Sequence, residues 1–349
     1  MDKKPLFYVI LSATLFGLSS PLAKLLVKDI SPVALAGLLY LGAFIGLAIY
    51  SLIRKIGTTN NQRAVPLEKR DFPWLIGAII AGGIVAPISL MFGLRMISGF
   101  STSLFLNLEG IATAIIAIFF FHENAGKRLW LALACVTIAG VLLSWNTEQN
   151  QFNIAGPLLV TLACIAWGVD NNLTRHISEK DPTQIVMLKG LIAGLVSLSL
   201  AFILGKGITF HINILLALLL GAFSYGLSLV FFIQALKGLG ASRTGIFYSF
   251  GPFIGAIASI IILKEWLGWV MIPAIALMIL GVWLITHEKH AHQHYHQPIT
   301  HTHSHRHDDS HHAHEHPEPV LGSHTHTHVH VAVSHAHPHW PDTHHRHAH

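Results

Sequence analysis

Residues 94–123 read LRMISGFSTSLFLNLEGIATAIIAIFFFHE, and a related stretch, LKGLGASRTGIFYSFGPFIGAIASIIILKE, occupies residues 236–265. Seven positions are identical at a constant offset of 142 residues, including the glutamates that close the two stretches, Glu123 and Glu265. Both stretches are long apolar runs with few charges, so their correspondence indicates an internal duplication.

The composition is that of a membrane protein. Hydrophobic residues make up 52% and charged residues only 11% of the 349 residues, whereas soluble domains carry about a quarter charged residues. A helix needs about 20 apolar residues to cross a bilayer. Ten such runs can be placed, at residues 6–27, 32–53, 73–97, 99–121, 129–146, 155–177, 182–205, 212–236, 241–263 and 268–286. We therefore predict an all-α polytopic membrane protein with ten transmembrane helices.

The duplication covers both halves of this apolar region. Three further motifs recur at offsets of 150 or 151 residues: Phe16-Gly17 with Trp167-Gly168, Lys24 with Arg175, and Pro32 with Pro182. Each half contains five spans, and an odd number of crossings inverts the second copy relative to the first. The prediction is two inverted five-helix repeats, at residues 1–146 and 147–286, followed by a tail at residues 287–349.

The distribution of Lys and Arg predicts the orientation. If the N-terminus lies inside, the inner side of the membrane receives 14 of these residues and the outer side receives 5. Positive loops favour the cytoplasmic side. We therefore expect a multi-pass protein of the inner or plasma membrane with both termini in the cytoplasm. Because the basic residues lie at the ends of apolar runs, we expect the lipid bilayer rather than nucleic acid as a partner.

Ionisable groups inside the spans are candidates for function, because placing them in hydrocarbon is expensive. Glu109 lies near the middle of the fourth run, two residues after Asn107. It is a candidate for proton coupling or for binding a substrate amine, or it forms a structural hydrogen bond between helices. Asp170 and Lys189 lie at similar depths in consecutive runs. They predict an ion pair, either a structural bridge or a gate.

Helix-breaking residues at corresponding places in two repeats often mark a binding site in transporters. Ser19-Ser20-Pro21 in the first run corresponds to Asp170-Asn171-Asn172 in the sixth, and we expect both to interrupt their helices. Gly82-Gly83 and Pro87 in the third run are expected to loosen that helix or to line a cavity.

Four further side chains could line a cavity for an amino-acid-like solute, or could simply pack between helices. They are Trp167, Tyr225, Tyr248 and Gln234.

The tail holds 24 of the 27 histidines, many alternating with small or polar residues. A segment of this composition cannot bury a core, so we expect disorder. Imidazole is a good ligand for zinc, nickel, cobalt and copper, and divalent-metal binding is therefore expected, with a pH-responsive charge brush or a neutral extension as alternatives. The candidate ligands are His292, His294, His296, His301, His303, His305, His307, His324, His326, His328 and His330. We expect no cofactor to be required elsewhere.

Residues 6–286 resemble the EamA-type transporters of the drug/metabolite transporter superfamily. The resemblance rests on the aromatic-Gly start of each half, on Lys24 and Ser31-Pro32, on the glutamates that close the fourth and ninth spans, and on Gly140-Val141-Leu142-Leu143 and Gly281-Val282-Trp283-Leu284. It implies a substrate cavity between the halves and alternating access driven by proton exchange or by the solute gradient.

Two positions depart from the pattern of this family. Its proline thirteen residues before the closing glutamate is kept as Pro252 but replaced by Gly110 in the first half, and an arginine common in the second span is missing around Gly37–Tyr40.

The leading hypothesis is a secondary active transporter that exports amino acids or related small metabolites, with or without proton coupling. No nucleotide-binding loop or catalytic constellation is visible, so we do not expect an enzyme. The first alternative is an exporter of a divalent metal or of a metal-chelating metabolite, although the spans contain no cluster of histidine or cysteine. The second is a membrane metal buffer or sensor. The sequence leaves the oligomeric state open.

Overall fold

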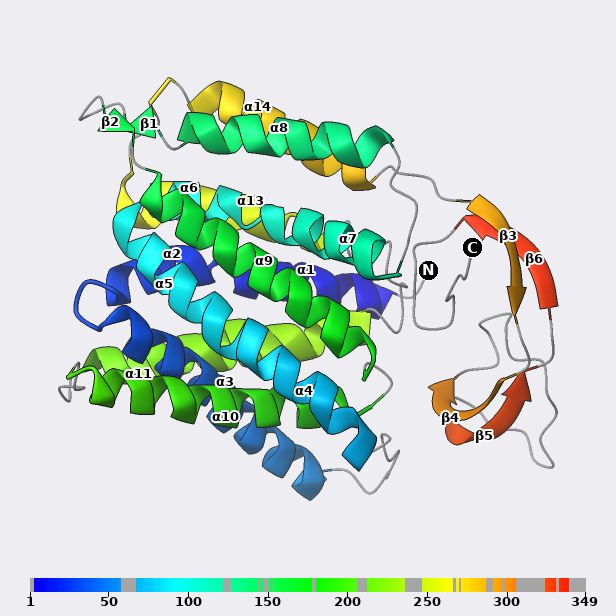
Figure 1. Cartoon of the computed structure of the whole chain (residues 1–349). Helices are drawn as coiled ribbons and strands as arrows, with labels where there is room; N and C mark the ends of the chain where they lie inside the picture. Colours follow the sequence, from blue (N-terminus) through cyan, green and yellow to red (C-terminus); the bar gives the residue numbers. More distant parts are fainter. Residues whose placement is uncertain are drawn as a thin grey trace.

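The computed structural model describes most of the apolar region and parts of the tail. The described residues are 3–57, 67–121, 127–143, 145–146, 151–152, 154–177, 180–205, 212–235, 247–265, 268–269, 271–286, 291–296, 299–305, 324–330 and 333–338. Up to residue 286 these segments are helical apart from turns and one short hairpin, and their helices lie side by side as a bundle (Figure 1).

The first half supplies five spans. The first span is α1 (Lys3–Gly17) with α2 (Ser19–Leu26), the second is α3 (Pro32–Gly57), and the fifth is α8 (Lys127–Leu143). The third begins with η1 (Lys69–Asp71) and continues through α4 (Phe72–Ala78), η2 (Ile79–Val85) and α5 (Ala86–Met96). The fourth is α6 (Gly99–Phe105) with α7 (Leu108–Phe121).

The second half follows the same plan after a hairpin of β1 (Trp145–Asn146) and β2 (Gln151–Phe152). Its spans are α9 (Ala155–Arg175), then α10 (Pro182–Ile203), then α11 (Ile212–Leu220) with η3 (Gly221–Leu227) and residues 228–235. The last two are α13 (Gly251–Leu263) and α14 (Met271–Thr286). All ten predicted spans are thus represented among the described helices.

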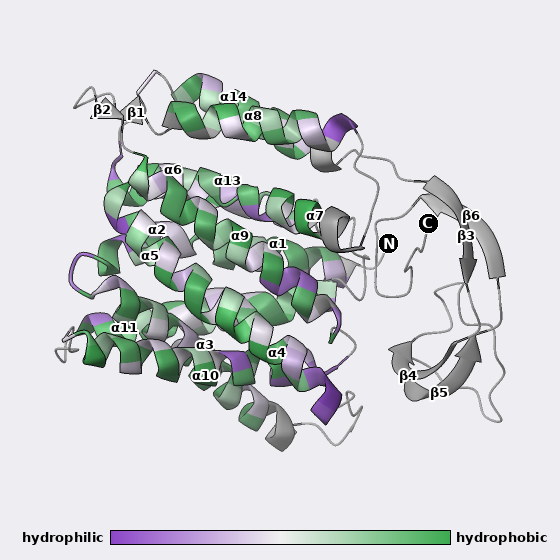
Figure 2. Ribbon diagram, viewed as in Figure 1, coloured by the Kyte–Doolittle hydropathy of each residue, from purple (hydrophilic) through white to green (hydrophobic). Residues whose placement is uncertain are grey.

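Five continuous helical stretches in the described residues are long and apolar enough to cross a bilayer by themselves: Lys4–Leu26, Pro32–Ile53, Lys69–Met96, Pro182–Ile203 and Ile212–Ala235. Hydrophobic residues cover the helices along their length, and hydrophilic residues gather at both ends of the bundle and on part of α9 (Figure 2). This pattern fits helices whose sides face hydrocarbon and whose ends face water.

The same residues start the second helix of each repeat. Pro32 is the first residue of α3 and Pro182 is the first residue of α10, positions where the missing proline N–H has no helical partner to lose. The Asp181 side chain also accepts a hydrogen bond from the Thr183 N–H at 2.9 Å, which caps α10.

The helix interruptions are placed symmetrically. The π-helical segments η2 and η3 begin at Ile79 and Gly221 and end at Val85 and Leu227, so each end obeys the offset of 142 residues. The fourth and ninth spans are likewise both interrupted, at residues 106–107 and at residues 249–250. Short π-helical segments often occur at functional sites, so the third and fourth spans of each repeat carry the irregular backbone.

The chain's start and the end of α14 lie at one end of the bundle, beside the tail (Figure 1). We call this the tail end; α9 ends and α10 begins there. At the other end, which we call the opposite end, α5 ends and α6 begins.

The tail contains strands where the sequence predicts disorder. β3 (Ala291–His296) pairs antiparallel with β6 (Val333–Pro338), and β4 (Ile299–His305) pairs antiparallel with β5 (His324–His330). In these strands histidine alternates with residues such as threonine, valine and tyrosine, which gives the two-residue period and the β-prone residue types of a strand. The all-α description therefore holds for the membrane spans and not for the tail.

Candidate functional site

Glu109 lies where the fourth span is interrupted. α6 ends at Phe105 and α7 begins at Leu108, so Glu109 is in the first turn of α7, where the helix dipole favours a negative charge. The Asn107 side chain is buried and donates a hydrogen bond to the Leu104 carbonyl oxygen at 3.0 Å. Asn107 therefore satisfies a carbonyl at the end of α6 and supports the break.

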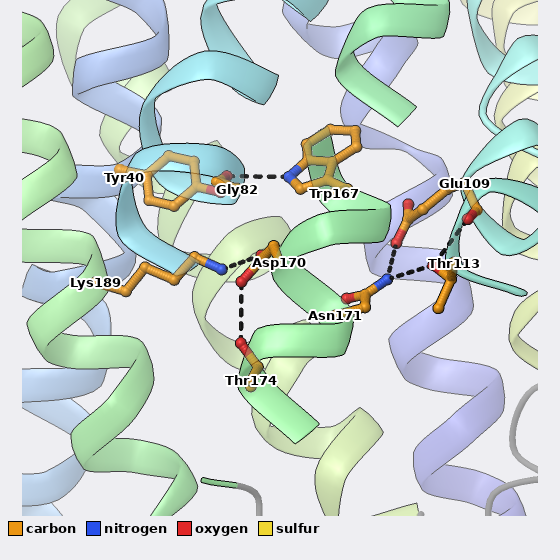
Figure 3. Close-up of polar contacts among 9 residues, drawn as sticks. All are labelled: Tyr40, Gly82, Glu109, Thr113, Trp167, Asp170, Asn171, Thr174 and Lys189. Atoms are coloured by element: carbon orange, nitrogen blue, oxygen red, sulfur yellow. Dashed lines mark hydrogen bonds and ion pairs between the residues drawn. The ribbon is translucent and has the colours of Figure 1, made fainter. Parts of the chain in front are cut away.

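The carboxylate of Glu109 contacts the other repeat. Its Oε1 accepts a hydrogen bond from Asn171 Nδ2 of α9 at 3.0 Å, and the same amide nitrogen lies 3.2 Å from Thr113 Oγ1 of α7. The next residue of α9 also contributes, because Asn172 Nδ2 donates to the Thr113 carbonyl oxygen at 3.0 Å. Consecutive asparagines of the second repeat thus hold the first turns of α7, and Figure 3 shows the contacts of Asn171.

The predicted ion pair between Asp170 of α9 and Lys189 of α10 is present. Asp170 is 5% exposed and Lys189 is 8% exposed, and Thr174 Oγ1 donates to the second carboxylate oxygen of Asp170 at 2.9 Å. Removing one member of a buried pair leaves an uncompensated charge at a cost of about 3–5 kcal/mol. Neither residue is therefore interchangeable with a neutral one while its partner remains charged.

The carbonyl oxygen of Gly82, within η2, accepts two side-chain hydrogen bonds. The Tyr40 hydroxyl of α3 donates to it at 2.5 Å, and Trp167 Nε1 of α9 donates to it at 3.1 Å (Figure 3). Because a π-helix changes the backbone hydrogen-bond pattern, a carbonyl in it can be served by side chains instead. The missing side chain of Gly82 also leaves room for the Asp170 carboxylate, which a β-carbon there would overlap.

Aromatic rings from both repeats surround these polar groups. Phe16 contacts Trp167, Tyr225 and Tyr248 at ring-centroid distances of 6.2, 6.4 and 5.6 Å, and Tyr40 contacts Tyr225 at 5.6 Å. Three of the four predicted lining residues, Trp167, Tyr225 and Tyr248, thus gather around Phe16 as a candidate lining.

A small cavity lies beside the ion pair. It is lined by Tyr40, Ala43, Val186, Lys189, Tyr225 and Leu229. Its volume, counted as the space open to the centre of a water molecule, is about 20 Å³, which is room for roughly one water. The space beside Lys189 is therefore too small for a solute larger than water in this structure.

The expected helix breaks are only partly where the sequence places them. α1 and α2 meet at Leu18, and Ser20 and Pro21 lie inside the first turn of α2, which tolerates proline. The expected interruption at residues 170–172 is wrong, because α9 runs unbroken from Ala155 to Arg175. The polar side chains of these residues pair with neighbouring spans and leave the helical backbone bonds intact.

Gln234 lies apart from the other predicted lining residues. It is nine residues beyond Tyr225 on the eighth span, a rise of roughly 13 Å toward the tail end. It does not line the cavity.

No metal centre is found in the described part of the chain, where no group of three or more His, Cys, Asp or Glu side chains is placed to hold an ion. The tail histidines at 292, 294, 296, 301, 303, 305, 324, 326, 328 and 330 lie on described strands. His307 lies outside the described residues.

Three site residues were missed by sequence reasoning: Phe16, Tyr40 and Thr113. Gly82 was expected to loosen its helix or to line a cavity, but the role of its carbonyl oxygen as an acceptor was not predicted. Phe16 belongs to a repeated motif and Tyr40 to the region that lacks the family's arginine, but neither was assigned a role in the site. An aromatic residue within an apolar span was the signal that could have indicated one. No local signal marks Thr113 or Gly82 as partners of α9.

Comparison with known proteins agrees with this arrangement. The EamA-like transporter family matches residues 3–145 and again residues 154–287. An uncharacterized transporter of Methanothermobacter thermautotrophicus is 26% identical over 269 residues, which cover 73% of this chain and 78% of the relative. A solved crystal structure superposes with a TM-score of 0.59 at 17% identity, covering 80% of this chain and 96% of the other, and so shows the same fold. The chain, with two copies of the family's repeat and a polar site between them, belongs to the EamA-like transporter family.

Proposed function

We propose that the chain is a secondary active transporter that exports amino acids or related small metabolites by alternating access, with protons coupled through Glu109. The observation that carries this proposal is the hydrogen bond between Glu109 of the first repeat and Asn171 of the second. Alternating access moves the repeats against each other, so a contact that joins them changes during the cycle.

The geometry at Glu109 supports a proton-binding role. Asn171 donates to Oε1, and among the described residues no hydrogen bond to Oε2 is present, so this oxygen is available for a proton or a substrate ammonium. An ionised carboxylate is expensive in hydrocarbon. Protonation removes that cost, so the repeats are expected to move against each other, with release of the Asn171 contact, while Glu109 is neutral.

The excess of Lys and Arg in the tail-end loops supports a cytoplasmic location for both termini. With that orientation the tail end opens to the cytoplasm and the opposite end opens to the outside. Export then proceeds by loading at the tail end and release at the opposite end.

The test is efflux from proteoliposomes loaded with the twenty amino acids, measured by mass spectrometry with and without a pH gradient. In Glu109→Gln the efflux driven by the pH gradient is expected to fall at least about tenfold, because an amide does not titrate and cannot couple proton movement to transport. Exchange of solute that does not depend on pH is expected to remain. Asp181→Asn, which neutralises a carboxylate that caps α10 within its own repeat and leaves an equally good capping side chain, is the matched control. Wild-type rates and unchanged pH dependence in Glu109→Gln would reject the coupling role.

The tail supports a second proposal, binding of a divalent transition metal such as zinc, nickel, cobalt or copper. In the β4–β5 pair three histidines of one strand lie directly opposite three of the other: His301 with His328, His303 with His326 and His305 with His324. Residues opposite each other occupy the same face of an antiparallel pair. The register thus places pairs of the residue type that these metals prefer opposite each other along the backbone, although no group of three or more among the described residues is positioned to hold an ion in this structure.

Calorimetric zinc titration of the full chain tests this second proposal. Replacing His301, His303 and His305 by alanine is expected to lower the zinc stoichiometry, whereas replacing the alternate residues Thr300, Thr302 and Ser304 is expected to leave it unchanged. Equal stoichiometry in both variants contradicts a site built by the register. Deleting residues 287–349 and measuring cellular zinc, nickel and cobalt separates metal binding from metal export.

A further inference from the structure

The ion pair of Asp170 and Lys189 lies at the wall of the cavity rather than in a sealed core. Lys189 lines that cavity together with Tyr40 and Tyr225. The Tyr225 hydroxyl is buried, on a residue that is 5% exposed, and it has no hydrogen-bond partner. The Ser19 hydroxyl is likewise buried without a hydrogen-bond partner. The cavity wall thus carries Lys189, whose carboxylate partner Asp170 lies directly beside it, and a hydroxyl without a hydrogen bond. Such a wall is suited to a polar ligand.

The symmetry of the repeats argues that the fold itself does not need this pair. Asp170 corresponds to Ser19 at the offset of 151 residues, and Lys189 corresponds to Leu39 at the offset of 150 residues. Ser19 and Leu39 are fully buried at their own positions. The first repeat therefore builds the equivalent region without charges. The charges in the second repeat are then better explained by a function than by a requirement of the fold.

From these observations we infer that Asp170 and Lys189 recognise the two charges of a zwitterionic solute, with Asp170 binding an ammonium group and Lys189 binding a carboxylate. This rests on the proposed function and assigns the substrate class of the same site. Before loading, each side chain neutralises the other. A zwitterion that enters between them replaces each partner with a group of the same charge, so no charge is left unpaired.

Because both charges of the site need a partner, it should select solutes that carry both an ammonium and a carboxylate group. A solute with only an ammonium group satisfies Asp170 and leaves Lys189 uncompensated, and a solute with only a carboxylate does the reverse. Leaving a buried charge or polar group unpaired is what makes such sites reject analogues strongly, on the order of 100-fold or more. The aromatic rings of Phe16, Trp167 and Tyr225 then contact the rest of the solute.

The cavity volume is consistent with loading by separation of the pair. Space for roughly one water is too small for an amino acid, so Asp170 and Lys189 must move apart to admit one. They belong to consecutive spans, α9 and α10, and Tyr40 and Ala43 in the cavity wall come from the first repeat. Movement between the repeats can therefore open this space.

The test compares three solute pools in proteoliposomes of the full chain at pH 6: the twenty amino acids, their methyl esters, which carry only the ammonium, and their N-acetyl derivatives, which carry only the carboxylate. The wild type is expected to move the amino acids about 100-fold faster than either derivative. Asp170→Asn, which leaves Lys189 charged, is expected to shift the preference to N-acetyl derivatives. Lys189→Met is expected to shift it to methyl esters.

The double variant Asp170→Asn/Lys189→Met removes both charges at once, so it avoids an unpaired buried charge. It is expected to lose the discrimination among the pools, with rates within about threefold of one another. A double variant that still prefers amino acids about 100-fold overturns the inference while leaving transport itself intact. A wild type that moves none of the pools but does move other metabolites overturns the proposed function instead.

Wild-type protein alone provides a second readout if a variant fails to fold. Amino acids that bind the folded state are expected to raise the melting temperature of the wild type, and the two derivative pools are expected to leave it unchanged at the same concentration. Equal stabilisation by all three pools overturns the inference.

Discussion

Gly82 shows how one residue can serve several spans. Its carbonyl oxygen accepts hydrogen bonds from Tyr40 of α3 and Trp167 of α9, and its missing side chain admits the carboxylate of Asp170. Gly82 lies within the π-helical segment η2, where the changed backbone hydrogen-bond pattern allows side chains to serve a carbonyl. A change of one methyl group at this position therefore affects the ion pair as well as the helix.

Gly82→Ala is expected to lower the thermal stability of the purified protein and to slow transport. The new β-carbon overlaps the Asp170 carboxylate, and overpacking of this kind costs about 1–3 kcal/mol.

Gly110→Ala is the matched control, because a β-carbon at Gly110 meets nothing within 4 Å and alanine favours a helix by up to about 1 kcal/mol. Its melting temperature is expected to be equal to or above that of the wild type. A melting temperature of Gly82→Ala that matches Gly110→Ala would show that the carboxylate does not need this space.

At the scale of elements, the short helix α6 is held from both sides at the opposite end of the bundle. Glu265 of the second repeat accepts hydrogen bonds from the Gly99 and Phe100 N–H groups, each at 2.8 Å, and Ser98 Oγ accepts one from the Ser101 N–H at 2.9 Å. These bonds satisfy N–H groups that no helical carbonyl can reach. Lys264, in the left-handed conformation at φ 53°, ends α13 just before Glu265.

Lys24 of α2 holds the other side of the same turn. Its Nζ donates to the carbonyl oxygens of Leu94 and Ile97 at 2.5 and 2.6 Å, where a cation complements the end of α5. The turn between α5 and α6 is therefore fixed by a cation on one helix end and an anion on the next. The glutamate that closes the ninth span, Glu265, therefore caps the start of α6.

Glu265→Ala is expected to raise hydrogen exchange of the Gly99 and Phe100 amides by about tenfold or more, because hydrogen bonds to a charged acceptor contribute about 1.5–3 kcal/mol each. Exchange can be followed by mass spectrometry on a peptide that covers residues 97–106.

Asp29→Asn is the control at the same end of the bundle, since Asp29 makes an exposed hydrogen bond to Asn213 at 2.9 Å and exposed contacts contribute little. It is expected to leave exchange in the 97–106 peptide unchanged. Wild-type exchange in Glu265→Ala would mean that Ser98 and Lys24 alone fix the turn.

At the scale of the whole molecule, contacts between the repeats close both ends of the bundle. Glu265 joins them at the opposite end. At the tail end Lys180 of the second repeat contacts Glu68 at 2.7 Å and Asp71 at 3.3 Å, and Gln184 Oε1 accepts a hydrogen bond from the Leu67 N–H at 3.2 Å. These contacts join the two repeats at both ends of the bundle in this structure.

The tail-end contact is expected to depend on pH. The hydrogen bond and the positive charge of Lys180 lower the pKa of Glu68 from its ordinary value of 4.5. A carboxyl with a lowered pKa in the folded state stabilises that state above pH 4.5 and loses this contribution as the pH falls through the lowered pKa. The difference in melting temperature between wild type and Glu68→Gln is therefore expected to be present at pH 7 and to vanish under strongly acidic conditions.

Arg70→Gln is the matched control for Glu68→Gln, because Arg70 is the exposed partner of Glu68, with a side chain that is 77% exposed. Its effect on the melting temperature at pH 7 is expected to be smaller than that of Glu68→Gln, since Lys180 still pairs with the carboxylate. A pH-independent difference between Glu68→Gln and the wild type would contradict a role for the charge of Glu68.

The sequence by itself determined the ten spans and their duplication, because apolar length and repeat spacing can be read along the linear chain. It also predicted the Asp170–Lys189 pair, since consecutive antiparallel helices place equal depths together. It did not place the irregular backbone correctly throughout, since the interruption predicted at residues 170–172 is absent from α9. Only the tertiary structure decided that Asn171 binds Glu109 and that Tyr40 and Trp167 share the Gly82 carbonyl. These hydrogen bonds depend on the rotation of each helix about its axis and on its crossing angle, which are set by packing between the repeats. No local sequence pattern encodes them.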